Sequence, residues 1–171
     1  MEVVQLALEH ERALREFLGE FADAGEPEIP AFLVDPGWPH PRIVETLAQW
    51  ARGEGLKEGW VPCTTFFLTH EGRVLGVATL RHRLTDFLWE YGGHVGYSVR
   101  PSDRGRGHAT RLLEAVKERA RGMGIRRLLA TCDVDNPASA RVIEKCGGLF
   151  EDESFNEAMS RTVHRYWIST T

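Results

Sequence analysis

The chain contains 171 residues, of which 42% are hydrophobic and 27% are charged, and its net charge at pH 7 is −4. This length allows one domain with a full hydrophobic core, so we expect residues 1–171 to form a single domain. The acidic balance disfavours a nucleic-acid partner, and no apolar run approaches the roughly 20 residues that a membrane-spanning helix needs.

Three cysteines, Cys63, Cys132 and Cys146, are spaced without a CxxC pattern. This sparse, odd-numbered set argues against a disulfide framework and against a zinc site, so we expect no metal. The N-terminal segment has early acidic residues and lacks a basic region followed by an apolar stretch, which argues against a signal peptide. Reduced thiols in a cytoplasmic protein are therefore the expectation.

The first part of the chain predicts one short strand and two helices. Residues 2–7 predict the strand, and residues 10–21 predict an amphipathic helix whose apolar side chains have helical spacing, namely Leu14, Phe17, Leu18 and Phe21. Residues 23–41 contain five prolines and predict a long loop, which is typical of functional or mobile segments. A second helix is expected over residues 42–53.

The rest of the chain alternates strands with two further helices. Residues 63–84 predict two strands joined at His70–Arg73, residues 85–93 predict a loop rich in aromatic side chains, and residues 94–100 predict a strand. The remaining elements are expected as helix 107–121, strand 126–134, helix 136–148, and strands 149–155 and 161–169. This order indicates an α/β (α+β) fold in which helices flank one mixed sheet.

The stretch from Arg104 to Gly107 is unusual because arginines and glycines alternate directly before a helix. Gly105 and Gly107 let the backbone approach a ligand closely, and the first N–H groups of a helix lack intrahelical acceptors. Arg104 and Arg106 add donors suited to phosphate geometry. These features predict a phosphate, and more specifically a diphosphate, held mainly by main chain. The alternative is a tight turn with solvated arginines, and spacing alone favours neither.

Two other phosphate-binding motifs are excluded. The pattern GxxxxGK[ST] is absent at this loop, and the dinucleotide pattern GxGxxG starting at Gly105 would require Gly or Ala where the chain has Thr110.

Three segments resemble signatures of the GNAT family of N-acetyltransferases. RGRGHA, read as R-x-x-G-x-A through Arg104, Gly107 and Ala109, resembles the family's coenzyme A loop. The preceding GHVGYSVRP resembles its fourth strand. NPASARVIEKCGG resembles its second signature, an Asn and a small residue ahead of a short helix that ends in Gly. The three segments occur in family order between Tyr91 and Phe150.

The resemblance implies a GNAT-like fold with a mixed, mostly antiparallel sheet of about six or seven strands, about four flanking helices, and a splay between the fourth and fifth strands. It also implies acetyl-CoA as co-substrate, with the pantetheine arm bonded to main chain at Tyr97, Ser98 and Val99. The pyrophosphate would bind amides of the loop and helix start, namely Arg104, Gly105, Arg106, Gly107, His108, Ala109 and Thr110. Asn136 and Ser139 would contact the arm. The alternative for Asn136 is the role of a helix N-cap, which is compatible with the first role. The alternative for His108 is a solvent-exposed side chain next to the bound anion.

The reaction that the resemblance implies moves an acetyl group from acetyl-CoA to an amine by direct attack. The acceptor is expected to be a small molecule or an exposed amino group. Residues 23–41 and 85–92, the latter with Phe87, Trp89 and Tyr91, are expected to frame its pocket, although such aromatic residues more often only pack. The sequence identifies neither the acceptor nor the oligomeric state. A homodimer is one of the alternatives that it leaves open.

One position departs from the family pattern. Many members have a Tyr seven residues after the signature Asn, where it acts as general acid for the leaving thiolate, and this position is Ile143 here. Tyr97 and Tyr166 are candidate substitutes. The departure also supports an alternative from a different class, a catalytically silent CoA-binding sensor or regulatory module.

The acceptor amine must lose a proton before it attacks. A primary amine with a pKa of ~10.4 is mostly protonated at neutral pH, and deprotonation costs roughly 4–5 kcal/mol there. His94 is the first candidate base, because family members often place a Glu seven residues before the position of Pro101 and an imidazole titrates near neutrality. Glu90, in the preceding loop, is the second. The alternative for His94 is a structural histidine bonded to a neighbouring carbonyl.

Overall fold

The computed structural model describes residues 1–157 and 160–171, and in these residues it contains four α-helices and one seven-stranded sheet. The strands are β1 (Glu2–Val4), β2 (Cys63–His70), β3 (Arg73–Arg81), β4 (Val95–Val99), β5 (Arg127–Asp133), β6 (Gly148–Asn156) and β7 (Arg161–Ser169). The helices are α1 (Glu11–Asp23), α2 (His40–Ala51), α3 (His108–Gly122) and α4 (Pro137–Lys145). No helix in the described residues is both long enough and apolar enough to cross a membrane.

The strands are ordered β1-β2-β3-β4-β5-β7-β6, and every neighbouring pair is antiparallel except the parallel pair of β4 and β5. This arrangement confirms the predicted mixed, mostly antiparallel sheet flanked by helices.

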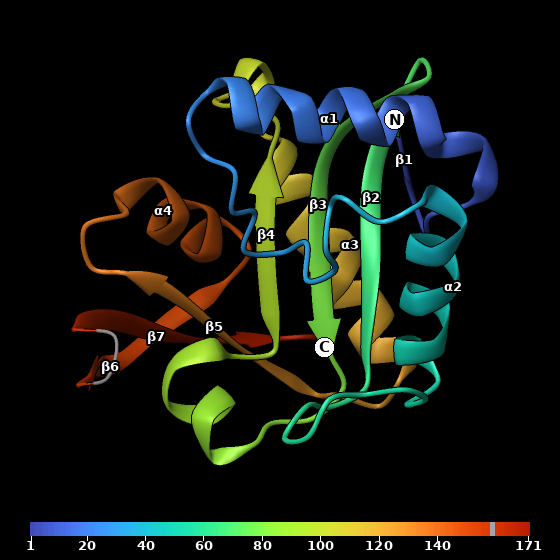
Figure 1. Cartoon of the computed structure of the whole chain (residues 1–171). Coiled ribbons are helices and arrows are strands. Elements are labelled where there is room, and N and C mark those ends of the chain that lie inside the picture. Colours follow the sequence, from blue (N-terminus) through green and yellow to red (C-terminus); the bar gives the residue numbers. More distant parts are fainter. Residues whose placement is uncertain (158–159) are drawn as a thin grey trace.

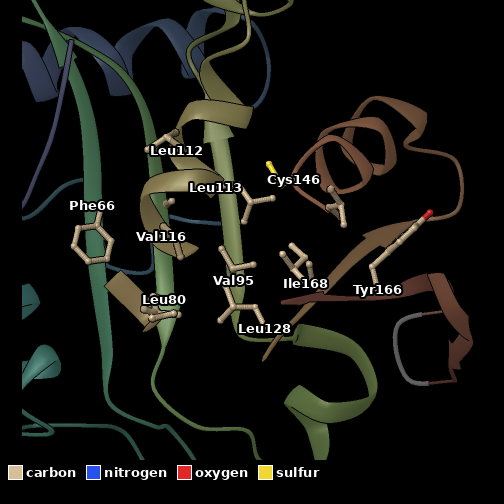
Figure 2. Close-up of a cluster of buried hydrophobic side chains, with 14 of the residues drawn as sticks. Phe66, Leu80, Val95, Leu112, Leu113, Val116, Leu128, Cys146, Tyr166 and Ile168 are labelled. Atoms are coloured by element: carbon tan, nitrogen blue, oxygen red, sulfur yellow. The ribbon is translucent and has the colours of Figure 1, made fainter. Parts of the chain in front are cut away.

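Helices cover both faces of the sheet (Figure 1). On one face α1 and α2 pack against β2 and β3, and Leu14 and Phe17 of α1 are wholly buried there. On the other face Leu112 and Val116 of α3 pack with Val95 of β4 and with apolar side chains of β5 and β7, as Figure 2 shows. Each such buried side chain contributes about 1.5–3 kcal/mol, so the two clusters hold the sheet between its helices.

The hairpin between β2 and β3 confirms the predicted turn. His70 pairs with Arg73, and the two residues between them, Glu71 and Gly72, have φ angles of 48° and 72°. Positive φ at both central positions matches the right-handed twist of the flanking strands, which explains why Gly72 stands at the second position.

Residues 85–93 were predicted to be a loop, and this was wrong for residues 86–92, which are helical. A π-helical turn, η2 (Leu88–Gly92), forms there and is closed by Gly93 N–H donating to Leu88 O at 2.6 Å. Gly93 has a φ of 62°, and a Cβ on it would approach Leu129 O to 2.5 Å. A single turn is too short to produce the periodic pattern by which a sequence indicates a helix.

The strands β4 and β5 separate soon after they meet. Their only paired residues are Val95 and Ala130, next to a bond from His94 N–H to Leu129 O at 2.7 Å. Figure 1 shows the two strands diverging from this point. The segment 24–39 crosses in front of β4, and Thr79 Oγ1 fastens it by donating to Ala31 O at 2.8 Å. This confirms the predicted splay between the fourth and fifth strands.

Candidate active site

The loop between β4 and α3 presents a row of main-chain donors. It begins with a 3-10 turn, η3 (Pro101–Asp103), and continues through Gly105 and Gly107, whose φ angles are 75° and 81°. Gly107 is the N-cap residue of α3 and has no side chain to cap the helix. Within the described residues, the N–H groups of residues 105–110 donate to no protein acceptor. The helix start therefore offers its positive end to a ligand.

Two carboxylates hold this loop in place. Glu20 of α1 accepts the Ser102 N–H at 2.7 Å and pairs with the Arg100 guanidinium. Burial alone would raise the pKa of Glu20, but the hydrogen bonds from Ser102 and Arg100 outweigh it and lower this pKa to about 2. Asp103, which is 3% exposed, accepts from Arg73 at 3.0 Å and from Arg106 at 3.1 Å. The loop is thus fixed before any ligand binds.

Both loop arginines already have protein partners. Arg104 makes two hydrogen bonds to the Glu26 carboxylate, at 2.9 and 2.5 Å, and donates to Val99 O at 3.2 Å. These bonds lower the pKa of Glu26. Arg106 pairs with Asp103. The charge that the sequence offered to a phosphate is therefore largely offset by Glu26 and Asp103, which leaves main-chain N–H groups as the free donors.

A cavity of about 460 Å³ adjoins this loop. It is lined by Phe21 and Glu26 from the α1 side, by Val142 from α4, and by all the residues predicted to bind CoA except Arg106 and Thr110. His108 differs from the sequence-based alternative, because it is 6% exposed and lines the cavity instead of standing in solvent. One cavity thus brings together the loop, β4 and the start of α4.

The edge of β4 that faces the splay carries unpaired main-chain groups. Arg81 N–H donates to His94 O at 2.7 Å, and Arg100 N–H donates to Leu75 O at 2.9 Å, so β4 uses its even-numbered residues to pair with β3. Alternation then directs the N–H and C=O of Tyr97 and Val99 to the other edge, where the ladder with β5 has ended. An extended ligand could pair there as a strand does.

The start of α4 lies on the side of this cavity opposite β4, and we call the space between them the slot. Asn136 Oδ1 accepts the Ser139 N–H at 3.1 Å, so Asn136 is the N-cap, and Pro137 follows at the first helical position. The Tyr97 hydroxyl lies 2.7 Å from Ser139 Oγ and 3.2 Å from Ser139 O. Burial raises the pKa of Tyr97, so its hydroxyl keeps its proton at neutral pH.

A second cavity, of about 320 Å³, continues the slot toward η2. It shares Pro30, Tyr97, Asn136 and Ser139 with the first, so the two cavities meet at these side chains. Its other lining residues include Arg81, Phe87, Tyr91, Thr131, Asp133 and Arg161. Trp89 does not line it and packs against Trp167, with ring centroids 5.4 Å apart.

The structure places His94 at a structural position. It is 7% exposed, and its Nδ1 accepts the Leu129 N–H at 2.9 Å. In a neutral imidazole the other nitrogen then carries the proton, so neither nitrogen is free to accept one. Burial and the charge of Arg81 lower the pKa of His94 to about 4. This geometry favours the structural alternative, with a main-chain N–H instead of a carbonyl as the partner.

Glu90 is half-buried beside the second cavity without lining it. One of its carboxylate oxygens accepts from Ser154 Oγ at 3.1 Å and lies 3.7 Å from Arg165 Nη1. Asp133, at the end of β5, lines the cavity directly and pairs with Arg161. Glu90 was named from the sequence, whereas Asp133 was not.

The two substitutes named for the missing Tyr lie in different places. Ile143 is wholly buried in the core cluster of α3 and β5. Tyr166 is 3% exposed and lines neither cavity. Tyr97 lines both cavities at their junction. Of Ile143, Tyr166 and Tyr97, only Tyr97 therefore lies where the two cavities meet.

Several site residues had no signal in the sequence. Glu26, Arg81 and Arg161 line the cavities from segments far from the motifs, and Glu20 holds the loop from α1. Their roles follow from contacts between residues distant in the chain, which no local pattern marks. In residues 1–157 and 160–171, no group of three or more His, Cys, Asp or Glu side chains is placed to hold a metal ion.

Comparison with known proteins agrees with this geometry. A family model described as an acetyltransferase (GNAT) domain matches residues 8–148. The chain belongs to the GNAT acetyltransferases. No curated protein sequence matches it.

Solved structures with the same fold include acetyltransferases from three different bacteria. A yncA protein from Salmonella typhimurium, described as a putative acetyltransferase with its cofactor acetyl-CoA, aligns with a TM-score of 0.64 at 16% identity over 99% of this chain and 94% of its own. A ribosomal-protein-alanine N-acetyltransferase from Brucella melitensis aligns with a TM-score of 0.66 at 18% identity over 99% of each chain. A mutant of the spermidine N-acetyltransferase SpeG from Vibrio cholerae aligns with a TM-score of 0.64 at 14% identity over 99% of this chain and 95% of its own. At these identities the likeness shows a shared fold.

Proposed function

We propose that this GNAT protein is an N-acetyltransferase that uses acetyl-CoA and acetylates an amine of a small molecule or an exposed amino group. The observation that carries the proposal is the row of N–H groups at residues 105–110, which have no acceptor among the described residues and lie beside a cavity of about 460 Å³. A diphosphate is the ligand class that such a loop and helix start bind best. The family membership and the acetyl-CoA-bound relative support the same ligand.

The remaining residues fit the rest of the coenzyme. The pantetheine arm would pair with the N–H and C=O groups of Tyr97 and with the N–H of Val99 along the edge of β4, since Val99 O already accepts from Arg104. Ser98 lines the same cavity. Asn136 and Ser139 at the start of α4 would contact the arm from the other side. We also propose a cytoplasmic location, because Cys63, Cys132 and Cys146 are free and buried, as in reducing compartments.

Bound acetyl-CoA supplies an electrophilic thioester carbonyl. The amine nitrogen forms a C–N bond to the acetyl carbon, the C–S bond breaks, one amine proton leaves to a base, and the thiolate takes up one proton. The chain's own residues must therefore hold the acceptor at the junction of the cavities, accept one proton and donate one.

A carboxylate is the base that the site favours. His94 has no free basic nitrogen. Asp133 lines the second cavity, of about 320 Å³, which we call the acceptor cavity, and Glu90 lies beside it. We assign the role to Asp133 in the first place, because a base must reach the amine directly or through one water. Glu90 stays the second candidate.

The proton donor to the thiolate is assigned to Tyr97. Its hydroxyl lies at the junction of the two cavities and keeps its proton, since burial raises its pKa. Ser139 Oγ, 2.7 Å away, orients this hydroxyl. The position that carries Tyr in many GNAT enzymes is filled by buried Ile143, so the donor comes from β4 instead of α4.

The absence of a hydroxyl at Ile143 favours one second candidate, a CoA-binding sensor without turnover. Calorimetry with acetyl-CoA, combined with a free-thiol assay over a panel of amines, separates the two. Binding with amine-dependent thiol release supports the enzyme, and binding without release from any amine supports the sensor. Absence of binding at millimolar acetyl-CoA would reject both.

A further inference from the structure

Arg81 is a half-buried cation at the end of β3 that lines the acceptor cavity. Its Nη1 donates to Gly92 O at 3.0 Å and to Gly93 O at 3.3 Å, at the joint between η2 and β4. The same side chain also lines a neighbouring cavity of about 370 Å³, whose other lining residues include Leu33, Trp60 and Phe87. Arg81 therefore stands between two cavities on one side of the slot.

No carboxylate in residues 1–157 or 160–171 forms an ion pair with Arg81. The two acids nearest to the acceptor cavity are paired elsewhere, Asp133 with Arg161 and Glu90 with Arg165. A guanidinium stays charged even when it is half-buried, and leaving it there without a counter-ion costs free energy. Its charge is felt locally, because it contributes to the lowered pKa of His94.

Part of the guanidinium remains available for a ligand. An arginine has five N–H donors, and the two carbonyls of Gly92 and Gly93 engage only Nη1. Within the described residues Nε and Nη2 donate to no protein acceptor, and neither is sealed from solvent. The hydrogen bonds to Gly92 O and Gly93 O thus account for Nη1 and leave Nε and Nη2 available to a ligand.

These two donors lie on one edge of a planar fork, the arrangement that binds both oxygens of a carboxylate. A cavity of about 320 Å³ is at the small end of the range for ligand sites, so it suits a small molecule. A polyamine would bring further positive charge next to Arg81 and Arg161, and like charges in a partly dry site repel.

We propose that Arg81 binds a carboxylate of the acceptor, which makes the substrate class small amines that carry their own carboxylate, as amino acids do. This inference rests on the proposed acetyltransferase function and adds its substrate class. The amine would then face the junction of the cavities at Tyr97, and the carboxylate would supply the counter-ion that Arg81 does not find among the described residues.

Matched substrates test the proposal in the unmodified protein. Thiol release is measured with acetyl-CoA and each of the twenty common L-amino acids, with the primary amide of each, and with spermidine. The best amino acid should exceed its amide by at least about tenfold in kcat/KM, because a hydrogen-bonded charge is lost in the amide. Equal rates for acid and amide, or a preference for spermidine, would overturn the proposal. Aminomethylphosphonate is compared with glycine, and a preference for the phosphonate would also overturn it.

Variants locate the preference at Arg81. Arg81→Gln should reduce the acid-to-amide ratio to near one while leaving the Kd for acetyl-CoA unchanged, and Arg81→Lys should retain part of the ratio. Exposed Arg83, two residues along, provides the control, and Arg83→Gln should keep the wild-type ratio. A wild-type ratio in Arg81→Gln would contradict the assignment.

A binding measurement tests the proposed function and the carboxylate site at Arg81 separately. It also gives a result if the protein shows no turnover with any amine. Each amino acid and its amide are titrated calorimetrically into the wild-type protein, with and without CoA. Failure of acetyl-CoA to bind would reject the proposed function, whereas acid-selective binding that is lost in Arg81→Gln and partly kept in Arg81→Lys would still support the carboxylate site. Binding of CoA with no selectivity for acids over amides would reject the carboxylate site alone.

Discussion

The two cavities of the slot are built in different ways. The larger one is lined from several segments, but its unpaired main-chain N–H donors come from the single stretch that runs from β4 through the loop to the start of α3. The smaller one uses side chains from β3, η2, β5 and β7, among them Arg81, Tyr91 and Asp133. A site made of backbone depends on conformation and tolerates many side chains, whereas a site made of side chains changes its ligand with each substitution. The coenzyme end is thus expected to be constant and the acceptor end specific to this protein.

The largest effect is expected from blocking the backbone of the coenzyme end. Gly107→Val should weaken acetyl-CoA binding by more than about 100-fold, because a branched residue resists the φ of 81° and its side chain would occupy the approach of the diphosphate. Calorimetry measures the Kd. The matched control is Gly124→Val, at a φ of 78° beyond the end of α3, which carries the same backbone strain away from the site. Equal losses in both variants would show that the effect is strain alone.

The next effect concerns the acceptor end. Asp133→Asn should lower kcat by about 10²-fold, the lower range for a general base, and leave the Kd for acetyl-CoA unchanged. Arg161→Gln breaks the same ion pair but keeps the carboxylate, so it serves as control. If Arg161→Gln lost as much activity as Asp133→Asn, the ion pair and not the base would be responsible, and Glu90→Gln would be the next variant to measure.

A smaller effect is expected from the anchor of the loop. Glu20→Gln should lower the free energy of unfolding by about 1.5–3 kcal/mol, since charge-assisted bonds to Ser102 and Arg100 are weakened. The pKa of Glu20 is lowered from 4.5 to about 2, so the wild-type protein has this stabilisation in full above pH 4.5 and loses it as the pH falls toward 2. Denaturant unfolding at pH 7 and pH 3 measures the difference, which should shrink at the lower pH. A difference that does not depend on pH would contradict the ion pair.

The smallest effect at neutral pH is expected at His94. Its folded-state pKa of about 4 lies below the ordinary 6.5, so the unfolded chain takes up the proton first and stability falls as the pH drops from 6.5 toward 4. The full difference corresponds to about 3 kcal/mol, and His94→Gln should remove it from the pH profile of unfolding. Exposed His70→Gln should leave the profile unchanged. A large loss of kcat in His94→Gln at unchanged stability would return His94 to the role of base.

Much of this protein follows from local pattern. The amphipathic helix at residues 10–21, the Glu71-Gly72 turn, and the Asn136-Pro137 helix start are set by neighbours in the chain, and the structure confirms each. The coenzyme loop was also visible, because glycines before a helix start act through the backbone that they belong to. The burial of His94, the pairing of Arg104 with Glu26 and the isolation of Arg81 were not visible, since each depends on partners far away in the sequence.

The amino-acid sequence by itself determined the order of strands and helices and where the backbone donors gather, because hydrophobic period and glycine placement act over a few residues. Only the tertiary structure decided which charges are already neutralised and which stay free in the slot, because charge pairing depends on distances between segments that the fold alone brings together.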